Sequence, residues 1–488
     1  MVTDGGKLPL LVYGLGRSGG AVVTRALAAG LEVVFYDQRR GGADIDAALA
    51  SGARRLDTLA DDGSAPLAER FALCVAAPGV AIDHPDLLRL VNEGVEVIGE
   101  VEWVWRQVPG VYIGVTGTAG KGSVTLWLTQ LLAEAGIDAV AGGNNDPALA
   151  AVARAGTYHV VELSSFQLER CPTFAPDIAI VLNLGEDHLD RHHTLEAYHR
   201  AKRNLVDNMR AGGTLVSNAD AAELERWAAE ADCEVLRFSL EHQADAWLER
   251  GSGKLWLHGE ELLERQALSV AGEHQVANAL AVALAAGALG RSANENLQID
   301  RSTIAQLLPS FSGLPGRYAL AAESRGISFI EDSIATRPLA VAAALSSTAK
   351  PLVWLAGGHS KGADVSSLRQ LVAERVDMLI TYGASGPELA AAFGDLVRVE
   401  QCRQNLGAAA LEAAVVKAVA YLEVEHGGHG NVLLAPLAAS FDQFNDYAAR
   451  AKVFRAVVDS VVQARDSGGR AAGSTAAGEA GAGESRRR

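Results

Sequence analysis

The amino-acid sequence predicts an α/β protein of three domains, and two observations carry this prediction. Short apolar segments alternate with Ala-rich helical stretches along almost the whole chain, which is the pattern of parallel sheets covered by helices. At roughly 100–200 residues per domain, the 488 residues are enough for about three cores. We therefore expect domains at residues 1–110, 111–312 and 313–465, followed by a tail at residues 466–488.

Each predicted domain has its own series of strand-like segments. In residues 1–110 they read PLLVYG, LEVVFYD, FALCVAAPG and VEVIGE. In residues 111–312 they read VYIGV, YHVVEL, IAIVLNL and GTLVSN, and the helical segment HQVANALAVALAAGAL follows, whose long apolar face must be buried. In residues 313–465 they read GISFIED, PLVWLAGG, VDMLITYG and NVLLAP, with a closing helix through about Val462.

Two segments are predicted to lie outside the packed domains. The turn-rich segment FSGLPGR, Phe311 to Arg317, is typical of a linker. From Asp466 onward the chain has almost no large apolar residue, so it cannot bury enough surface to offset the entropy lost on ordering. We expect the tail to be disordered.

Composition excludes several classes of protein. A net charge of −16 argues against a nucleic-acid scaffold, because phosphate backbones are held by clustered Lys and Arg. The four cysteines show no CxxC or zinc-ligand spacing, which favours buried thiols in a reducing cytoplasm. No segment approaches about 20 consecutive apolar residues, and the N-terminus lacks a signal-peptide pattern. We expect a cytoplasmic protein that does not insert into membranes.

The segment GLGRSG, Gly14 to Gly19, is a candidate binding loop. It follows an apolar strand and opens a helix, and Asp37 ends the next strand about 20 residues further on. This arrangement places a pyrophosphate at a helix N-terminus and predicts a Rossmann-like domain. The ligand is either a nicotinamide dinucleotide or a UDP-linked molecule, and glycines that only allow tight packing of strand and helix are the structural alternative.

The segment VTGTAGKGS is typical of a phosphate-binding loop, so the central domain is predicted to be a P-loop ATPase-type α/β domain. Gly117 and Gly120 let backbone N–H groups turn toward phosphate oxygens, and Lys121 supplies a mobile positive charge. Gly122 stands where such loops usually carry Ser or Thr as a ligand of magnesium. We expect Ser123, Thr118 or water to face the metal instead.

Polar residues follow the later strands of the central domain. Glu162 ends a buried strand, where a lone carboxylate is costly unless it meets a cation, so we interpret it as a Mg²⁺ ligand; a structural Glu paired with Lys or Arg is the alternative. The strand IAIVLNL is followed, at its carboxyl end, by Asp187, His188 and Asp190. Two carboxylates and an imidazole there could bind a second metal ion or align a substrate. Helix capping by Asp187 is compatible with this. Lys202, taken alone, is interpreted as a solvated charge.

Three polar segments also stand at strand ends of the third domain: EDSIATRP, LAGGHSKGAD and APLAASFDQFNDYAARAKVF. Helix capping explains Asp332, Ser440 or Asp442 individually, but it does not explain three such clusters in one domain. Glycines, hydroxyls and charges at strand ends build binding loops.

These motifs, in this order, resemble the muramyl ligase family over about Pro9 to Val458. The motifs that carry the resemblance are GLGRSG, APGV followed by HP, GVTGTAGK, GGNN, ELSSFQLE, LNLGEDHLDRH, the AK of YHRAKR, GEHQVANA, GLPGR, EDSIAT, GGHSKGAD and ASFDQF. Within the family, ELSSFQLE and ASFDQF are similar to those of members that add D-glutamate. The resemblance implies an ATP-dependent amide ligase that adds D-glutamate to UDP-N-acetylmuramoyl-L-alanine in cytoplasmic peptidoglycan precursor synthesis. It also implies an acyl phosphate, a tetrahedral intermediate, release of ADP and phosphate, a monomeric protein and large hinge motion of the last domain.

The resemblance also implies roles for individual residues. The UDP-sugar would contact Ser18, Asp37, Arg39, Pro78 and Gly79, which displaces the nicotinamide alternative. ATP would contact Gly117, Thr118, Gly120, Lys121, Gly122, Ser123, Asn278, Arg317 and Asp332. Two Mg²⁺ ions would be held by Glu162, His188 and a carbamylated Lys202, with Asn144 near substrate and metal; Lys121, His188, Lys202 and Asn144 would be the catalytic residues. D-Glutamate would meet Thr336, Lys361, Ser440 and the ring of Tyr447.

The sequence departs from the family pattern at several positions. Ala119 stands where Asn is usual, Gly122 for Ser or Thr, Gly316 for His and Glu331 for Asn, and GGNN lacks the following Ile-Gly. Three alternatives therefore accompany the ligase hypothesis: a weakened relative that only binds nucleotide, another amide ligase of the superfamily such as a folylpolyglutamate-type enzyme, and an NAD-dependent oxidoreductase.

Overall fold

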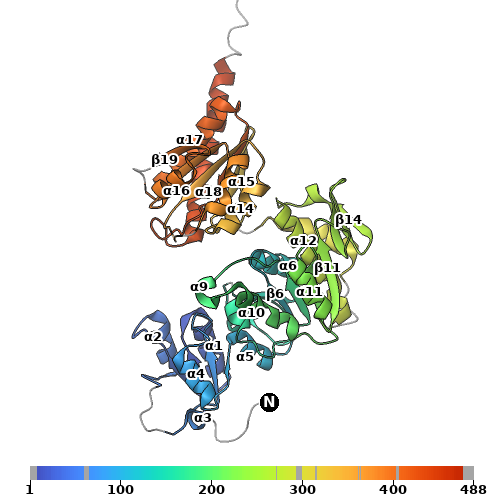
Figure 1. The fold of residues 1–488 in the computed structure, drawn as a ribbon, viewed down its shortest axis with the longest axis vertical. Helices are drawn as coiled ribbons and strands as arrows, with labels where there is room; N and C mark the ends of the chain where they lie inside the picture. The colour runs from blue at the N-terminus through green and yellow to red at the C-terminus, as the bar shows by residue number, and fades with distance from the viewer. Residues whose placement is uncertain are drawn as a thin grey trace, which may run out of the picture. The chain divides into compact units, whose positions relative to one another are not determined.

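The computed structural model describes residues 8–59, 65–144, 146–270, 272–292, 299–313, 316–360, 362, 364–402 and 406–475. The chain forms two compact units: the first runs to Leu268 and includes Val276–Phe311, and the second contains Ser269–Gln275 and the chain from Ser312 onward. Within the described residues the units contain three sheets, of five, nine and six strands, so the predicted α/β fold with three layered parts is confirmed (Figure 1). The domain boundaries near residues 110 and 312 stay a prediction.

The first sheet is wholly parallel, with strand order β3-β2-β1-β4-β5. This is the strand order of a Rossmann-like sheet: β1, β2 and β3 run outward on one side, and β4 and β5 follow on the other side of β1. Its strands are β1 Leu10–Tyr13, β2 Val33–Tyr36, β3 Arg54–Arg55, β4 Leu73–Ala76 and β5 Val97–Ile98. Its helices are α1 Gly16–Ala28, α2 Ala43–Ala50, α3 Leu67–Arg70, α4 Pro85–Asn92 and α5 Glu100–Gln107.

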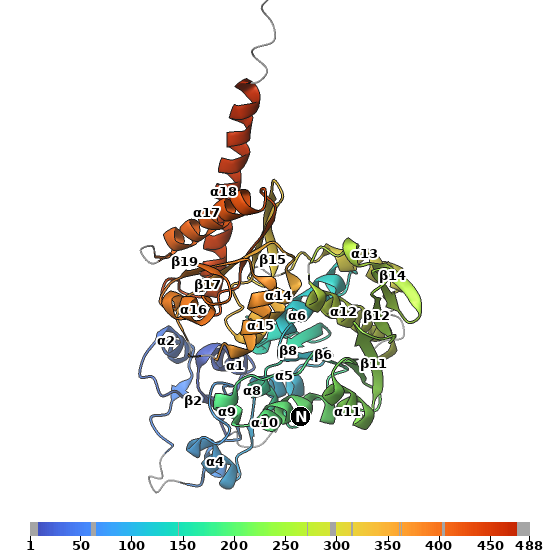
Figure 2. The same ribbon diagram turned by 45° about the horizontal axis from the view of Figure 1, so that its top comes forward.

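The second sheet has the order β14-β13-β12-β11-β10-β9-β6-β8-β7, and it is parallel except for the antiparallel edge β12-β13-β14 (Figure 2). Its strands are β6 Val111–Thr116, β7 Ala139–Gly143, β8 Tyr158–Glu162, β9 Ile178–Val181, β10 Thr214–Asn218, β11 Glu234–Ser239, β12 Ala246–Glu249, β13 Lys254–Leu257 and β14 Glu260–Glu264. Its helices are α6 Lys121–Glu134, α7 Leu149–Val152, α8 Ser165–Leu168, α9 Leu189–His192, α10 Leu195–Asp207, α11 Ala222–Glu230, η1 Arg265–Ala267, α12 Glu273–Ser292, α13 Arg301–Leu307 and η2 Leu308–Ser310. The strand that leads into the phosphate-loop motif, β6, thus lies inside the sheet between β9 and β8.

The third sheet has the order β15-β16-β20-β17-β18-β19, and only β15 is antiparallel to its neighbour. Its strands are β15 Ala319–Ser324, β16 Ile327–Glu331, β17 Leu352–Gly357, β18 Met378–Tyr382, β19 Arg398–Cys402 and β20 Gly430–Leu434. Its helices are α14 Pro338–Ser347, η3 Ser366–Leu368, α15 Arg369–Arg375, α16 Gly386–Phe393, α17 Ala408–Glu425 and α18 Tyr447–Thr475. Two apolar clusters show that α17 and α18 cover one face of this sheet while α14, α15 and α16 cover the other.

One continuous apolar core joins the first two sheets. It runs from Val12 and Val22 through Val101 and Leu168 to Val181, all buried. Polar contacts reinforce it: buried Glu102 pairs with Arg106 at 2.8 Å and accepts a hydrogen bond from the Thr173 backbone N–H at 3.2 Å. The carboxyl ends of the first sheet are therefore held firmly against the second.

The Ala-rich helix and the C-terminal segment test two composition-based predictions. Helix α12 spans Glu273–Ser292, and Leu280, Val282 and Leu284 are fully buried, as predicted. At the other end α18 extends to Thr475, ten residues into the segment for which the sequence predicts disorder; residues 476–488 are outside the described part. Lengthening an existing helix needs no new nucleus, so a segment without a core-forming face can continue one.

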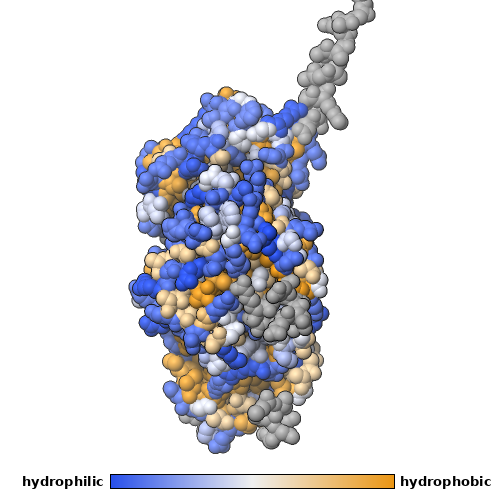
Figure 3. All heavy atoms as spheres, turned by 90° about the vertical axis from the view of Figure 1, so that its right-hand side faces the viewer, coloured by the Kyte–Doolittle hydropathy of each residue, from blue (hydrophilic) through white to orange (hydrophobic). Residues whose placement is uncertain are grey.

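Hydrophilic residues cover most of the face drawn in Figure 3 and are interrupted by smaller hydrophobic areas. None of the helices in the described ranges combines the length and apolar character needed to cross a membrane.

A pair of neighbouring glycines in α1 tests how closely this helix packs on the turn after β1. A Cβ atom at Gly19 would overlap the carbonyl oxygen of Gly14, whereas a Cβ at Gly20 would meet nothing within 4 Å. We expect Gly19→Ala to destabilise the first unit by about 1–3 kcal/mol through overpacking. Gly20→Ala should stabilise it by about 0.5–1 kcal/mol, because alanine loses less backbone entropy in a helix. Thermal unfolding of the two full-length variants measures this, and equal midpoints would contradict the close approach.

Candidate active site

The loop between β6 and α6 has the backbone that a phosphate-binding loop needs. Gly117 and Gly120 have φ angles of +153° and +85°, and Gly120 precedes the first residue of α6, Lys121. A Cβ atom at Gly120 would lie 2.7 Å from Oδ1 of Asn278 on α12. Glycine is therefore required at this position both by its left-handed conformation and by the close approach of Asn278. The N-terminus of α6, with its outward N–H groups, follows directly.

Asn183, which the sequence analysis does not single out, anchors this loop. Its Oδ1 accepts hydrogen bonds from the backbone N–H groups of Thr118 at 3.1 Å and Ala119 at 2.9 Å. Its Nδ2 donates to the Ala119 carbonyl oxygen at 3.1 Å. The signal available in the sequence was an Asn just after the end of a buried strand, within the quoted motif LNLGEDH.

Two lysines converge on one carbonyl of the loop. Lys121 Nζ donates to the Gly117 carbonyl oxygen at 2.9 Å and to that of Thr118 at 3.1 Å. Lys202 Nζ, from α10, also donates to the Gly117 carbonyl oxygen, at 2.9 Å. The interpretation of Lys202 as a solvated charge is wrong, since only 1% of this residue is exposed.

The surroundings of Lys202 favour its neutral form. Burial lowers the pKa of the Lys202 ammonium well below its ordinary value, the charge of Lys121 lowers it further, and Glu162 partly opposes both. The ring of Tyr198 lies 4.7 Å from Nζ, and the Tyr198 hydroxyl lies 3.2 Å from Oγ1 of Thr118 in the loop. A neutral amine at this position can act as a nucleophile or as a hydrogen-bond acceptor.

Glu162 ends β8 and is 2% exposed. Its Oε1 accepts a hydrogen bond from Nδ2 of Asn144 at 2.8 Å. Its Oε2 is buried and has no hydrogen-bond partner within the described part of the chain. A buried carboxylate oxygen without a hydrogen-bond partner is a suitable ligand for a cation. The structure also brings Lys121, Glu162, Asn144 and Lys202 close together, as the sequence predicts.

His188 lies beside this group rather than within it. It adopts a left-handed conformation with φ of 54°, its backbone N–H donates to Asp187 Oδ1 at 2.7 Å, and its ring lies 4.6 Å from that of Phe166. Its ring is 6.4 Å from that of Tyr198, which in turn contacts Lys202. Over the described ranges no three His, Cys, Asp or Glu side chains are grouped closely enough to hold a metal ion. The side chain of Asp190 is outside the described part, and the metal-ligand set stays a prediction.

A second feature that the sequence did not indicate is a hydrogen-bonded chain behind His188. His192 Nδ1 lies 3.2 Å from Glu169 Oε1, and its Nε2 lies 2.9 Å from Ser165 Oγ. Burial lowers the pKa of His192, while Glu169 opposes this shift. The ring packs 5.4 Å from that of Tyr198. These hydrogen bonds thus hold α9 against the rings of Phe166 and Tyr198, the second of which contacts Lys202.

The predicted UDP-sugar residues lie at the carboxyl end of the first sheet. Asp37 accepts hydrogen bonds from the Leu15 backbone N–H at 2.9 Å and from the Arg39 side chain. These bonds, that to Arg39 first, lower the pKa of Asp37 to about 2. Asp37 thereby ties the GLGRSG turn to the end of β2, while the Arg39 guanidinium is left half exposed.

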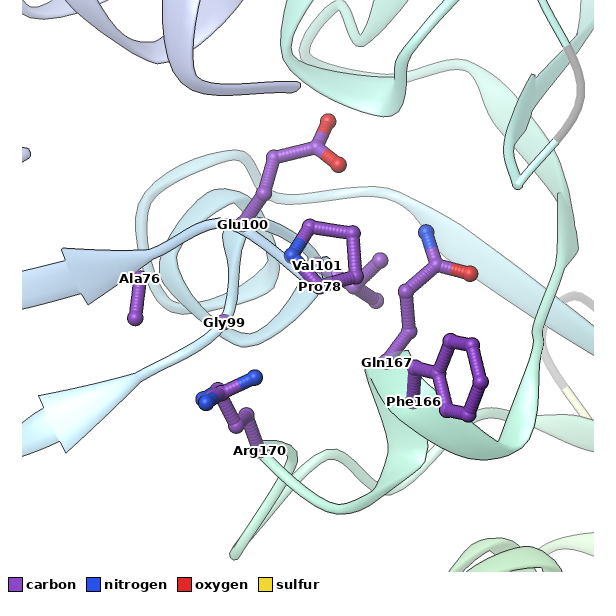
Figure 4. Close-up of a pocket in the computed structure, with 8 residues that line it drawn as sticks. All are labelled: Ala76, Pro78, Gly99, Glu100, Val101, Phe166, Gln167 and Arg170. Atoms are coloured by element: carbon purple, nitrogen blue, oxygen red, sulfur yellow. The ribbon is translucent and has the colours of Figure 1, made fainter. Parts of the chain in front are cut away.

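Ser18 and Pro78 meet a buried carboxyl group, Glu100. Its Oε1 accepts a hydrogen bond from the Ala150 backbone N–H at 2.6 Å, and the Ser18 hydroxyl also bonds to it. Burial raises the pKa of Glu100 to about 7. Figure 4 shows the small pocket that Glu100 and Pro78 line together with Gln167 and other residues of the second sheet's layer. Gly79 follows Pro78 and is exposed.

The predicted residues of the second unit gather at the carboxyl ends of β16 and β20. Asp332 follows β16, its backbone N–H donates to the Leu434 carbonyl at 2.8 Å, and burial, followed by the charge of Glu331, raises its pKa to about 7. Thr336 lies in the same turn, and Arg317 immediately precedes Tyr318 and β15. Lys361 is outside the described residues.

Ser440 and Tyr447 flank the turn that leads into α18. The Ser440 carbonyl accepts hydrogen bonds from the backbone N–H groups of Gln443 at 3.0 Å and Phe444 at 2.8 Å, and Ser440 is buried. Tyr447 begins α18 and is 40% exposed.

Arg450, a residue not predicted as part of the site, ties these loops together. It is fully buried and donates to the carbonyl oxygens of Ser333 at 2.8 Å, Ala438 at 3.2 Å and Gly357 at 3.5 Å. These carbonyls follow or end β16, β20 and β17, the three neighbouring parallel strands. Nothing in the local sequence distinguishes this arginine from a surface charge of α18.

Comparison with known proteins finds relatives of almost the whole chain. Residues 9–99 match the family described as Mur ligase MurD-like, N-terminal domain, and residues 115–286 match the Mur ligase middle domain. The UDP-N-acetylmuramoylalanine–D-glutamate ligase of Thermus thermophilus is 39% identical over 453 residues, covering 92% of this chain and 96% of that protein. The protein of the same name from Deinococcus radiodurans is 38% identical over 473 residues, 96% of each chain.

Solved structures share the fold at lower identity. A pseudomurein peptide ligase type C from Methanothermus fervidus has a TM-score of 0.57 at 17% identity and covers 93% of this chain and 100% of its own. MurF ligase from Thermotoga maritima, solved in complex with ADP, has a TM-score of 0.56 at 18% identity and covers 89% of this chain and 96% of its own. At these identities the similarity concerns the fold alone. The near full-length relatives and the two matched domains show that the chain belongs to the Mur ligase family.

Proposed function

We propose that this chain is the ligase that joins D-glutamate to UDP-N-acetylmuramoyl-L-alanine, with conversion of ATP to ADP and phosphate, in the cytoplasmic synthesis of peptidoglycan precursors. Two relatives that carry this activity in their names match 92% and 96% of the chain. The structural observation that carries the proposal is the convergence of Lys121 and Lys202 on the Gly117 carbonyl of the phosphate loop, beside buried Glu162. We further propose that the protein acts as a monomer.

The first chemical task of the site is to hold a triphosphate and make its terminal group transferable. The N-terminus of α6, with Gly122 and Ser123 in its first turn, offers backbone N–H groups and a positive dipole end. Lys121 Nζ, now bonded to two carbonyls of its own loop, can exchange these for phosphate oxygens. Gly117, Thr118 and Gly120 shape the cradle, and Asn278 contacts the nucleotide side of the loop.

The reaction then runs in two steps. The alanyl carboxylate attacks the terminal phosphorus of ATP, the bond to ADP breaks, and an acyl phosphate forms. The amine of D-glutamate attacks the activated carbonyl, gives a tetrahedral oxyanion, loses a proton and expels phosphate, which leaves the amide. Lys121 neutralises charge on the moving phosphoryl group, and we propose that Asn144 lies near the substrate and the metal and that His188 is a metal ligand.

Of the two Mg²⁺ ions that the family implies, one suits the buried carboxylate of Glu162, and we propose that the other ligands come together around it when ATP is bound. Glu162 offers a buried oxygen that lacks a hydrogen-bond partner within the described chain, and His188 and a carbamylated Lys202 would supply further ligands. Bound magnesium would supply positive charge that offsets the phosphate oxygens. Without the hydroxyl ligand that Gly122 cannot offer, Ser123, Thr118 or water would complete the coordination.

The remaining residues are proposed to bind the organic parts of the substrates. Ser18, Asp37, Arg39, Pro78 and Gly79 would hold the UDP-sugar, since they gather at the carboxyl end of a Rossmann-like sheet where such ligands bind. Arg317 and Asp332 would contact ATP. Thr336, Lys361, Ser440 and Tyr447 would contact D-glutamate.

Replacement of Lys121 tests the function directly. We expect Lys121→Ala to lower phosphate release that requires both UDP-N-acetylmuramoyl-L-alanine and D-glutamate by about 10³-fold or more, because an uncompensated phosphoryl charge is left in the transition state. The readout is a coupled phosphate assay with each substrate omitted in turn.

Lys254 provides the matched control for this assay. It lies on β13 and pairs with Glu261 at the surface, so Lys254→Met should retain wild-type turnover. Wild-type-like turnover of Lys121→Ala would refute the assignment. Nucleotide binding by wild-type protein without substrate-dependent ADP formation would favour the weakened, non-catalytic relative instead, and ADP formation with other amino acids would favour another amide ligase.

The burial of Lys202 leads to a second prediction, about its modification. An amine must lose its proton before it attacks CO₂ to form a carbamate, and one proton is released. Because the pKa of Lys202 is lowered, its carbamate should form at a pH where a lysine with an ordinary pKa of about 10.4 stays protonated. With ¹³C-bicarbonate we expect a carbamate ¹³C resonance near pH 7–8 in the wild type and in Lys254→Met but not in Lys202→Met. The same resonance in Lys202→Met would contradict the prediction.

A further inference from the structure

Two consecutive buried carboxyl groups end the strand β16. Glu331 is 0% exposed and Asp332 is buried as well. Glu331 Oε2 accepts a hydrogen bond from the Gly316 backbone N–H at 2.7 Å, and its Oε1 accepts one from the Ser333 backbone N–H at 3.0 Å. Both oxygens of this side chain are therefore committed to backbone groups of two different turns.

These carboxyl groups hold the chain on both sides of Arg317. Glu331 accepts a hydrogen bond from the backbone N–H of Gly316, the residue before Arg317. Asp332 accepts one from the backbone N–H of Tyr318, the residue after Arg317. The Gly316 carbonyl, in turn, accepts a hydrogen bond from the Ile334 N–H at 3.0 Å. The residues on either side of Arg317 are thus fixed by three hydrogen bonds, to Glu331, Asp332 and Ile334 at and just after the end of β16.

Gly316 adopts a left-handed backbone beside the ring of Tyr447. Its φ angle is +84°, and a Cβ atom there would lie 3.5 Å from the ring of Tyr447. Glycine adopts this left-handed backbone without strain, so it is the bond to Glu331, and not the glycine itself, that holds the segment in place.

Glu331 also sets the charge around Asp332. Its negative charge is, after burial, the main cause that raises the pKa of Asp332, while the Tyr318 N–H and the Arg317 guanidinium lower it. Arg455 of α18 lies 3.4 Å from Glu331 Oε2 and balances part of this charge. The groups that face this pair are accordingly Arg317, Tyr318 and Arg455.

We propose that Glu331 is a positioning residue for ATP: by accepting the backbone N–H of Gly316, the residue before Arg317, it holds this segment so that the Arg317 guanidinium and the neighbouring Asp332 carboxyl group are presented together to the nucleotide. The inference rests on the proposed function, in which Arg317 and Asp332 contact ATP. It adds a residue that itself touches no substrate and whose effect should appear in the KM for ATP.

Two substitutions separate the hydrogen bond from the charge. Glu331→Asp keeps the charge but is one methylene too short to reach both turns, so the KM for ATP should rise about tenfold while its pH dependence is unchanged. Glu331→Gln keeps the length but removes the charge and one acceptor. Its KM for ATP should also rise, and the pH below which ATP binding weakens, near 7 in the wild type, should move lower because the pKa of Asp332 falls.

The measurement is the steady-state KM for each substrate between pH 6 and 9. The KM for the UDP-linked substrate should stay within about twofold of wild type, because the residues proposed to bind it belong to the first sheet and none of them contacts the segment around Arg317. Glu323→Gln is the matched control, because Glu323 is an exposed carboxylate on the adjacent strand β15 that bonds only to Ser328 in the described part. It should behave as the wild type.

The outcomes distinguish this inference from the proposed function. If the wild type shows no ADP formation dependent on both substrates, the proposed function fails. If the wild type is active and both Glu331 variants fold with an unchanged KM for ATP, or if all three KM values rise together, the positioning role is refuted. Should both variants fail to fold, amide hydrogen exchange of the wild type decides: the Gly316 and Tyr318 amides should be strongly protected, and exchange as fast as in an exposed loop would overturn the inference.

Discussion

The site depends on one carbonyl oxygen, that of Gly117, which accepts hydrogen bonds from the side chains of two lysines. Lys121 and Lys202 each donate to it at 2.9 Å, so two like charges are held a few ångströms apart at the mouth of a parallel sheet. Like charges at such a distance, one of them almost fully buried, are stable only if one is neutral or if anions are close. Two features of the protein reduce this repulsion: the lowered pKa of Lys202, which favours its neutral form, and the nearby negative charge of Glu162. The negative charge of a bound triphosphate would reduce it further.

Carboxyl groups at strand ends are used in the same way throughout the chain. Glu100 follows β5, Glu162 ends β8 and Glu331 ends β16, and each is buried with at least one oxygen bonded to a neighbouring polar group. In a parallel sheet the carboxyl ends of all strands lie on one edge, so a residue there meets the loops of its neighbours. The carboxylates therefore connect turns that are distant in sequence: Glu100 bonds to α7, and Glu331 bonds to the segment before β15. Each also carries its charge to the edge where ligands bind.

Polar side chains that bond to loop backbone complete the framework. Arg450 donates to three carbonyls at or after the ends of neighbouring strands, and Asn183 makes neutral contacts to the backbone of the phosphate loop. Such residues touch the backbone rather than the functional side chains. Their effect is to limit how far the binding loops can move, which a reaction between three bound anions requires, because small misplacements cost large factors in rate.

The sequence by itself determined the features that depend on local pattern. Apolar periodicity predicts the parallel strands, and the phosphate loop is recognisable because its glycines, lysine and following helix are contiguous. The position of Glu162 at the end of a buried strand predicts its burial, which the structure confirms, while its role as a metal ligand stays a prediction. The helix through Asp466 to Thr475 is the local feature that composition predicts differently, since low apolar content argues against a core but not against extending a helix.

What only the tertiary structure decided is which polar groups are buried and what they meet. Lys202 has the sequence of a surface charge and becomes buried because α10 packs against the loop after β6. Asn183, His192, Glu331 and Arg450 each likewise have a partner that lies from 15 to 117 positions away in the chain. Hydrogen-bond partners and desolvation depend on distances between segments that fold together, and no local pattern of residues encodes those distances.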